Sequence, residues 1–161
     1  MNAKAGVYNQ RIPVASAMNG PRLDLTALRN ALASLAGGLE LVGDLAWFDS
    51  QPAIARDMLI AGIIQSFEFV YEISVKMIRR QLEMDALSPT EIDGANFKDI
   101  LRIAAERGLI DNVEAWFKYR KMRNQTAHTY DRVKAQEVYR DTQTFVGDAQ
   151  SLLDRLEAHN G

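Results

Sequence analysis

Residues 52–86 read PAIARDMLIAGIIQSFEFVYEISVKMIRRQLEMDA, a helical pattern that can run without a break to about Leu82 or Ala86. Its apolar residues recur at steps of three and four, which is typical of one face of an α-helix. That face consists of Ile60, Ile64, Phe67, Tyr71, Val75, Ile78 and Leu82, and Ile63, Val70, Ile73 and Met77 widen it. So broad a surface predicts contact with more than one neighbouring helix. Asp49-Ser50 is expected to cap this helix, with Pro52 in its first turn.

A second apolar stripe precedes this stretch along the chain. It comprises Leu25, Leu28, Leu32, Leu35, Leu39 and Val42. Steps of three and four again predict a helix, with spacing similar to that of a coiled coil. Gly37-Gly38 interrupts the stripe, and each glycine costs up to about 1 kcal/mol in a helix interior. We expect the close approach of a neighbouring backbone there, or a kink.

Three further helices follow, separated by capping signals. A short helix is expected from about Asn96 to Arg107, ended by Gly108 as a left-handed cap. Asp111-Asn-Val-Glu114 resembles a capping box and opens the next helix, whereas Ser88-Pro-Thr-Glu91 predicts only a short turn. The last helix follows Asp131.

The absence of strand alternation and of repeats predicts one all-α domain. We expect an antiparallel up-and-down helical bundle of four to five helices over residues 22–161. Residues 1–21 contain Gly6, Pro13, Gly20 and Pro21 with little periodicity, and they are expected to form a flexible N-terminal arm.

Composition restricts the possible functions. A chain of 161 residues with 47% apolar content can bury a sizeable core. Its net charge of −2 gives no global attraction to nucleic acid, so a polyanion needs a local patch. The lack of cysteine excludes thiolate metal sites and thiol nucleophiles, and two histidines leave little for zinc. We therefore expect no metal and no cofactor. No apolar run or N-terminal signal core stands out, which predicts a cytoplasmic protein without membrane contact.

The chemistry of the chain is concentrated in residues 119–131, which read YRKMRNQTAHTYD. The planar fork of Arg123 suits a phosphate, and a histidine such as His128 can exchange a proton near neutral pH. Asn124 and His128 are four residues apart and share a helix face, whereas Arg123 points about 140° away from His128 on an ideal helix. Arg123 must therefore curl back, or the helix must loosen around residues 126–128.

Lys118, Arg120 and Lys121 add a local basic patch beside this stretch. Each feature also has a plain structural interpretation. Lys118 to Arg123 can be a solvated face, His128 can end a helix, and Tyr130 can pack at a helix junction. Trp116 and Phe117 fit a core or interface better than a base-stacking platform. The combination in one order favours the functional interpretation.

Arg123-Asn-Gln-Thr-Ala-His128 resembles the Arg-x4-His motif of the HEPN superfamily of helical bundles. The blocks around it resemble the nucleotidyltransferase substrate-binding branch, whose pattern covers roughly residues 25–157. These blocks are residues 65–72 (QSFEFVYE), Lys76, residues 108–111 (GLID), Trp116, Arg123-Asn124 and residues 128–131 (HTYD). That branch is similar to the toxin partner of HEPN and minimal-nucleotidyltransferase toxin–antitoxin pairs.

The resemblance implies a homodimer whose interface brings two Arg123 and His128 sets together. It also implies metal-independent endoribonuclease activity, and an AMP modification of Tyr130 by a minimal nucleotidyltransferase antitoxin. On this hypothesis His128 moves protons, Arg123 stabilises charge on the phosphate, and Asn124 orients His128 or binds a phosphate oxygen. The alternative is a non-catalytic subunit that binds a substrate or nucleotide for a separate nucleotidyltransferase. A third hypothesis is a helical oligomerisation module without phosphate chemistry.

We also expect the helix that opens at residues 111–114 to lie near a two-fold dimer axis, because a single bundle would struggle to bury residues 60–82 together with Trp116 and Phe117.

Overall fold

The computed structural model describes residues 20–88 and 90–161, and these residues form helices without any strand. The α-helices are α1 (Thr26–Gly43), α2 (Leu45–Ser50), α3 (Ala53–Asp85), α4 (Thr90–Asp93), α5 (Phe97–Glu106), α6 (Val113–Gln125) and α7 (Arg132–Asn160), with a 3-10 turn, η1 (Thr126–His128), before α7. The prediction of an all-α bundle is confirmed. The expected N-terminal arm falls almost wholly outside the described residues.

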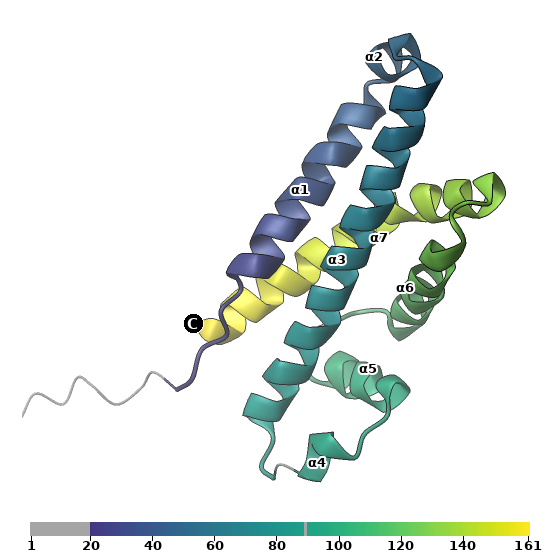
Figure 1. Ribbon diagram of the computed structural model, residues 1–161. Helices are drawn as coiled ribbons and strands as arrows, with labels where there is room; N and C mark the ends of the chain where they lie inside the picture. Colours follow the sequence, from purple (N-terminus) through teal and green to yellow (C-terminus); the bar gives the residue numbers. More distant parts are fainter. Residues whose placement is uncertain (1–19, 89) are drawn as a thin grey trace, which may run out of the picture.

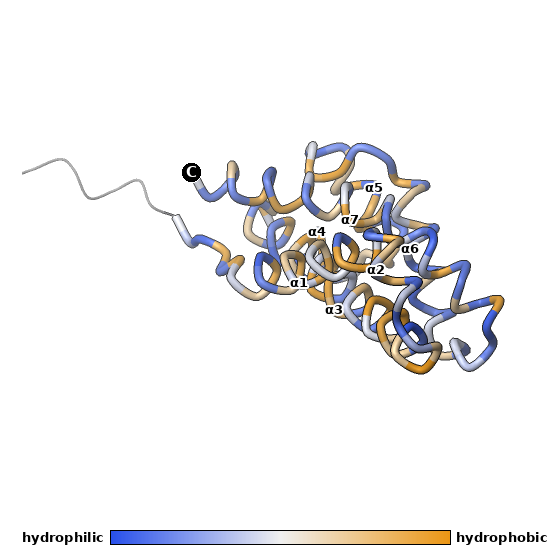
Figure 2. The backbone as a smooth tube through the Cα atoms, turned by 90° about the horizontal axis from the view of Figure 1, so that it is seen from above, coloured by the Kyte–Doolittle hydropathy of each residue, from blue (hydrophilic) through white to orange (hydrophobic). Residues whose placement is uncertain are grey.

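Helix α3 is the centre of the bundle. Figure 1 shows α1 lying beside the N-terminal part of α3. Helix α7 crosses behind α3, and α5 and α6 lie on the other side of α3. Phe67, Val70, Ile78 and Leu82 of α3 are fully buried. Each long helix alternates between hydrophobic and hydrophilic residues along its turns, as Figure 2 shows. This alternation explains how helices with solvated outer faces share one core.

By length and composition alone, α3 is also apolar enough to cross a membrane, so the expectation that no such run exists was wrong. The core helix of a folded domain meets the same criteria, because its apolar face is broad. In this structure that face packs against α1 and α7.

The glycine pair in α1 stays within the helix, which runs on to Gly43. A Cβ atom added at Gly38 would lie 2.7 Å from Cδ1 of Ile63 on α3. A Cβ atom added at Gly37 would have no neighbouring atom within 4 Å. The expected close approach is therefore real at Gly38, but it comes from a side chain of α3 rather than from a neighbouring backbone.

The helix boundaries follow the capping signals closely. Asn96 caps α5 through the backbone N–H of Asp99, and Gly108 adopts the left-handed conformation with φ of +75°. Asp131 caps α7, as predicted.

Two capping predictions were wrong. Asn112, not Asp111, caps α6, because the Asp111 carboxylate pairs with Arg155 of α7 instead. Asp49-Ser50 belongs to α2 and does not cap the following helix, since Pro52 precedes α3 without a side-chain cap.

Trp116 is a core residue, only 2% exposed. Its ring contacts Tyr119 and Phe145 edge to face, with centroids 5.5 Å and 6.0 Å away. Phe117 is partly buried against the same core. The argument that one bundle would struggle to bury Trp116 was therefore wrong, and it gives no support to a dimer.

Candidate active site

The candidate site lies where α6 ends. After Gln125 the chain tightens into the 3-10 turn η1, in which the Thr126 hydroxyl donates to the carbonyl of Arg123 at 2.6 Å. The Thr129 hydroxyl donates to the carbonyl of Thr126 at 3.1 Å, and Asp131 then starts α7. The helix therefore changes geometry at residues 126–128, where the sequence required a deviation from an ideal helix.

Arg123 is held firmly against α3. Its Nε and Nη2 atoms donate to Oε1 of Glu72 at 2.9 Å and 2.6 Å, and Nη1 donates to the Thr126 hydroxyl at 3.1 Å. Oε2 of Glu68 lies 3.8 Å from Nη2. The hydrogen bond to Glu72, and then the nearby charge of Glu68, raise the pKa of Arg123 above its already high ordinary value. The guanidinium is thus permanently charged and fixed in orientation.

His128 projects from η1 and is exposed. Its ring meets the ring of Tyr130 edge to face, with centroids 6.0 Å apart. Within residues 20–88 and 90–161, no hydrogen bond joins Asn124 to His128, so the expected orienting contact is not made in this structure. Asn124 instead faces a pocket between α5 and α6. The imidazole is left accessible to a ligand.

The expected basic patch divides into two parts. Lys118 forms an ion pair with Asp141 of α7 at 3.3 Å. Arg120 and Lys121 instead line the pocket between α5 and α6 with Asn124. Arg120 and Lys121 therefore remain candidate ligand-binding residues on one surface, whereas Lys118 belongs to the contact with α7.

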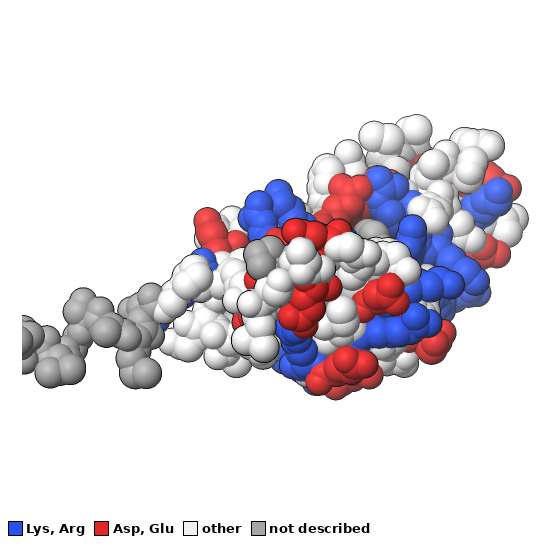
Figure 3. All heavy atoms as spheres, turned by 90° about the horizontal axis from the view of Figure 1, so that it is seen from below, with Lys and Arg blue, Asp and Glu red and all other residues white. Residues whose placement is uncertain are grey.

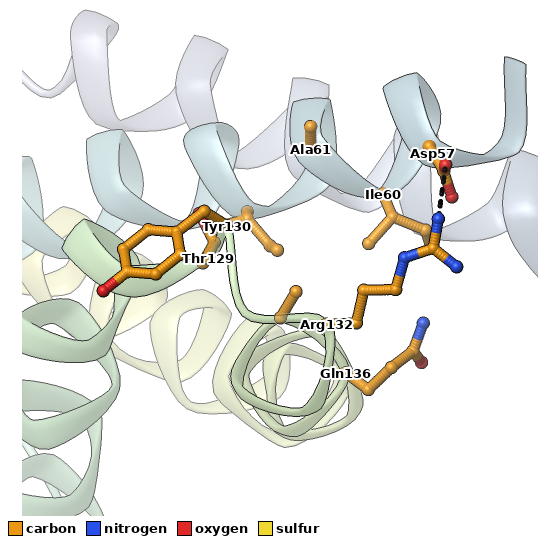
Figure 4. Close-up of a pocket in the computed structure, with 9 residues that line it drawn as sticks. Asp57, Ile60, Ala61, Thr129, Tyr130, Arg132 and Gln136 are labelled. Carbon is orange, nitrogen blue, oxygen red and sulfur yellow. Dashed lines mark ion pairs between the residues drawn. The ribbon is translucent and has the colours of Figure 1, made fainter. Parts of the chain in front are cut away.

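Tyr130 is 84% exposed at the junction of η1 and α7. It borders a pocket of about 380 Å³ between α3 and the start of α7. Figure 4 shows its hydroxyl pointing away from that pocket, while Arg132 pairs with Asp57 at the other end, at 3.8 Å. The phenol is accessible, and the arginine that shares its pocket is Arg132. Neither Arg123 nor Lys121 lines this pocket.

Glu68 and Glu72 are site residues to which the sequence pattern assigned no role. Both belong to α3, four residues apart, so they share one helix face. Two carboxylates one turn apart, within residues 58–75 that carry no other charge, are a signal for a cationic partner. The pattern did not identify Arg123 as that partner, because it lies 51 residues beyond Glu72.

No group of three or more His, Asp or Glu side chains that could hold a metal ion occurs in the described part of the chain. The arrangement offers a fixed guanidinium and an exposed imidazole. Such a pair can bind a phosphodiester and move a proton beside it.

Known proteins resemble this chain in sequence and in fold. The family model described as nucleotidyltransferase substrate binding protein like matches residues 23–158. A Haemophilus influenzae protein named probable ribonuclease HepT is 47% identical over 139 residues, which cover 86% of this chain and 95% of that protein.

Solved structures show the same fold. One from Haemophilus influenzae, described as the substrate-binding domain of a nucleotidyltransferase, has a TM-score of 0.80 at 47% identity, covering 83% of this chain and 99% of its own. A Thermus thermophilus structure at 24% identity has a TM-score of 0.62 over 80% of this chain and 98% of its own, and supports the fold alone.

Proposed function

Because the chain belongs to the nucleotidyltransferase substrate binding protein like family, we propose that it is a HEPN-type ribonuclease toxin controlled by a cognate nucleotidyltransferase. The observation that carries this proposal is the exposed imidazole of His128, on the turn that directly follows the helix holding Arg123. The name of the Haemophilus influenzae relative, a probable ribonuclease, supports the same activity. We propose that the protein acts in the cytoplasm.

The proposed reaction is an internal transfer that needs no metal. His128 takes the proton of a ribose 2′-hydroxyl, the 2′-oxygen attacks the adjacent phosphorus, and the bond to the 5′-oxygen breaks. The leaving 5′-oxygen receives a proton from water, and His128 then returns its own proton to water, so the products are a 2′,3′-cyclic phosphate and a 5′-hydroxyl. General base catalysis of this kind contributes about a hundred- to ten-thousand-fold in rate.

Arg123 stabilises the charge that develops on the phosphate. Its Nε and Nη2 donors already bind Glu72, so the phosphate must share or replace that carboxylate. The side chain of Glu72 is 53% exposed, so water competes with the ion pair and exchange with a phosphate is inexpensive. Glu72 therefore holds Arg123 in place until a substrate binds.

The decisive experiment measures cleavage of single-stranded RNA in EDTA by the purified protein. We expect wild-type protein to leave 2′,3′-cyclic phosphate ends, detectable by mass spectrometry. His128→Ala should lower the rate by about a hundredfold or more. His159→Ala is the matched control, because His159 near the C-terminus of α7 contacts only a backbone carbonyl of its own helix. Equal cleavage by wild type and His128→Ala would refute the assignment.

A second function is favoured by the description of the solved Haemophilus influenzae relative as a nucleotidyltransferase substrate-binding domain. In that case Arg123 and His128 bind phosphate without cleaving it, and a nucleotidyltransferase partner performs the chemistry. Expression without the partner separates the two functions. A ribonuclease toxin stops growth and His128→Ala relieves the arrest, whereas a binding subunit is harmless in both forms.

We also propose a homodimer. Exposed apolar side chains on α3 support an additional interface, because Ile54, Met58 and Phe69 are 71%, 67% and 53% exposed. Light scattering should give twice the 18.0 kDa chain mass at micromolar concentration. A monomer at that concentration would refute the dimer and the composite active site.

A further inference from the structure

Helices α5 and α6 line an open pocket of about 550 Å³. Its lining combines two aromatic rings with three cations and an amide. These residues are Phe97, Lys98, Phe117, Arg120, Lys121 and Asn124. In Figure 3, which views the molecule from the end bearing α4, Lys and Arg side chains gather toward one side of the surface. The pocket thus joins flat apolar surfaces to positive charge.

The rings and cations of the two helices are interlocked. The guanidinium carbon of Arg120, on α6, lies 4.2 Å from the ring centroid of Phe97, on α5. A cation of α5 likewise lies over a ring of α6, since Nζ of Lys98 is 5.9 Å from the centroid of the Phe117 ring. Contact with the ring restrains the Arg120 guanidinium and leaves its other face and its edge donors open to a ligand.

The positive charge of the pocket is not neutralised by neighbours. Among the described residues, no carboxylate forms an ion pair with Lys98, Arg120 or Lys121, in contrast to Arg123 and Lys118. Glu114 is the one acidic lining residue, so the pocket has an excess of two positive charges on a chain of net charge −2. Such a local excess attracts a polyanion that the whole protein does not.

The pocket adjoins the candidate active site along α6. Asn124, one of its lining residues, directly precedes Gln125 at the end of α6 and directly follows Arg123. Lys121 is three residues earlier, a rise of about 4.5 Å. The pocket and the candidate active site therefore lie at the same end of α6, with Arg123 itself turned toward Glu72 of α3.

We propose that this pocket is a nucleotide-binding subsite for the RNA strand whose phosphodiester lies at Arg123 and His128. A base stacks on the Arg120 guanidinium, which Phe97 supports from behind, and Lys98 and Lys121 bind the flanking phosphates. The inference rests on the proposed function, since it names the substrate class of the same site as single-stranded RNA. Arg120 and Phe97 are positioning residues and take no part in the proton transfer.

Single-stranded RNA fits this chemistry better than a duplex or an acidic protein. A base must expose a face to stack on a guanidinium or an aromatic ring, and a duplex hides those faces within its own stack. An acidic peptide would use the cations but not the stacked Arg120 and Phe97 pair. Stacking is also tolerant of sequence, because every base has a flat face.

The test uses the full-length protein and a short fluorescent single-stranded RNA with 2′-O-methyl groups throughout, which lacks the attacking hydroxyl. Fluorescence anisotropy over a range of salt concentrations gives the affinity and its salt dependence. Arg120→Lys keeps the charge but removes the planar stacking surface, and we expect about a tenfold loss of affinity with an unchanged salt slope. Lys121→Ala should weaken binding and reduce the slope of log K against log salt by about 0.7.

The matched control is Arg102→Ala, which removes a cation from α5 outside the pocket. Arg102 pairs with Asp99, and its side chain is 59% exposed. We expect its affinity for the RNA to stay within twofold of wild type. Equal losses in Arg102→Ala and Lys121→Ala would overturn the subsite, because each variant removes one cation and the effect would then be one of net charge alone. The same RNA annealed to its complement should bind more weakly than the single strand, and stronger duplex binding would also overturn it.

Cleavage of unmodified RNA, measured separately, distinguishes the failure of this inference from the failure of the proposed function. If the wild-type protein cleaves RNA but Arg120→Lys and Lys121→Ala bind the RNA as tightly as wild type, the subsite is overturned and the proposed function stands. Wild type that binds through the pocket and cleaves nothing leaves the subsite standing and refutes the ribonuclease. Loss of affinity for a nucleotidyltransferase partner in Arg120→Lys, without loss of RNA affinity, assigns the pocket to a protein interface and overturns the subsite.

Discussion

The guanidinium of Arg123 on α6 donates two hydrogen bonds to a single carboxylate oxygen of Glu72 on α3, at 2.9 Å and 2.6 Å. This contact joins the central helix of the bundle to the candidate active site. It also means that the cation expected to bind a phosphate is already bound to an anion. A substrate phosphate therefore competes with Glu72, and Glu72 controls both the orientation and the availability of Arg123.

Glu72→Gln should strengthen RNA binding. The amide oxygen still accepts a hydrogen bond from Arg123, but the negative charge that would repel a phosphate is gone. Binding of a 2′-O-methyl RNA, measured by anisotropy, should become several-fold tighter. Stability should change by less than about 1 kcal/mol, because the Glu72 side chain is 53% exposed. Weaker binding with unchanged stability would show that the charge of Glu72 is needed to hold Arg123 in its binding orientation.

Tyr130→Phe should leave the fold and RNA cleavage intact while abolishing modification by the nucleotidyltransferase. The phenol is 84% exposed, so its hydroxyl can be reached by a second enzyme. AMP attached there adds a bulky anion next to the His128 ring, whose centroid is 6.0 Å away. Intact mass after co-expression with the adjacent gene should show one or more AMP units on wild type and none on the variant. If the nucleotidyltransferase still modifies Tyr130→Phe, or still silences its activity, regulation does not act through Tyr130.

The glycine pair of α1 provides a matched test of packing. Gly37→Ala should stabilise the protein by up to about 1 kcal/mol, since the new methyl group meets no atom within 4 Å. Gly38→Ala introduces a Cβ atom 2.7 Å from Cδ1 of the buried Ile63, which must then move within the core. Urea unfolding should rank Gly37→Ala as clearly the more stable variant. Equal stability would mean that Ile63 rotates away at no cost.

Alkaline pH should destabilise the protein partly through Tyr71. Burial raises the pKa of Tyr71 from 10.0 to about 12, with nearby Arg120 and Arg123 opposing the shift. Between pH 10 and 12 the unfolded chain loses the phenol proton while the folded chain retains it. Stability is therefore fully present below pH 10 and falls by about 2 to 3 kcal/mol as the pH approaches 12.

Tyr71→Phe tests this assignment, because it removes the titrating group and should flatten the decline in urea-unfolding free energy between pH 10 and 12. Tyr130→Phe is the control, since it removes the hydroxyl of an exposed tyrosine rather than of a buried one. An unchanged slope in Tyr71→Phe would assign the alkaline loss to another group. Tyr119 is the next candidate, because burial and the hydrogen bond it donates to Asp148 also raise its pKa.

The sequence by itself determined the five longer helices, several of their ends and the faces that they bury, whereas the short helices α2 and α4 were not predicted. Gly108 and Asp131 end and start helices where they were expected to, because a left-handed turn and an N-terminal cap depend on the residue itself and on neighbours within one turn. The apolar stripes of residues 25–42 and 60–82 likewise became core surfaces, since their period is that of the helix. The motif of Arg123 and His128 was also recognisable, because its members are near one another in the chain.

Only the tertiary structure decided which side chains meet across helices. Pairing of Arg123 with Glu72 and stacking of Arg120 on Phe97 depend on how α6 crosses α3 and α5, which no local pattern specifies. The packing of α6 against α7 turned Lys118 toward Asp141 and buried Trp116 against Phe145, so residues close together in sequence acquired different roles. The physical reason is that caps and periodicity arise from contacts within one helix. The partners of a charge or a ring depend instead on the angle and register at which whole helices pack.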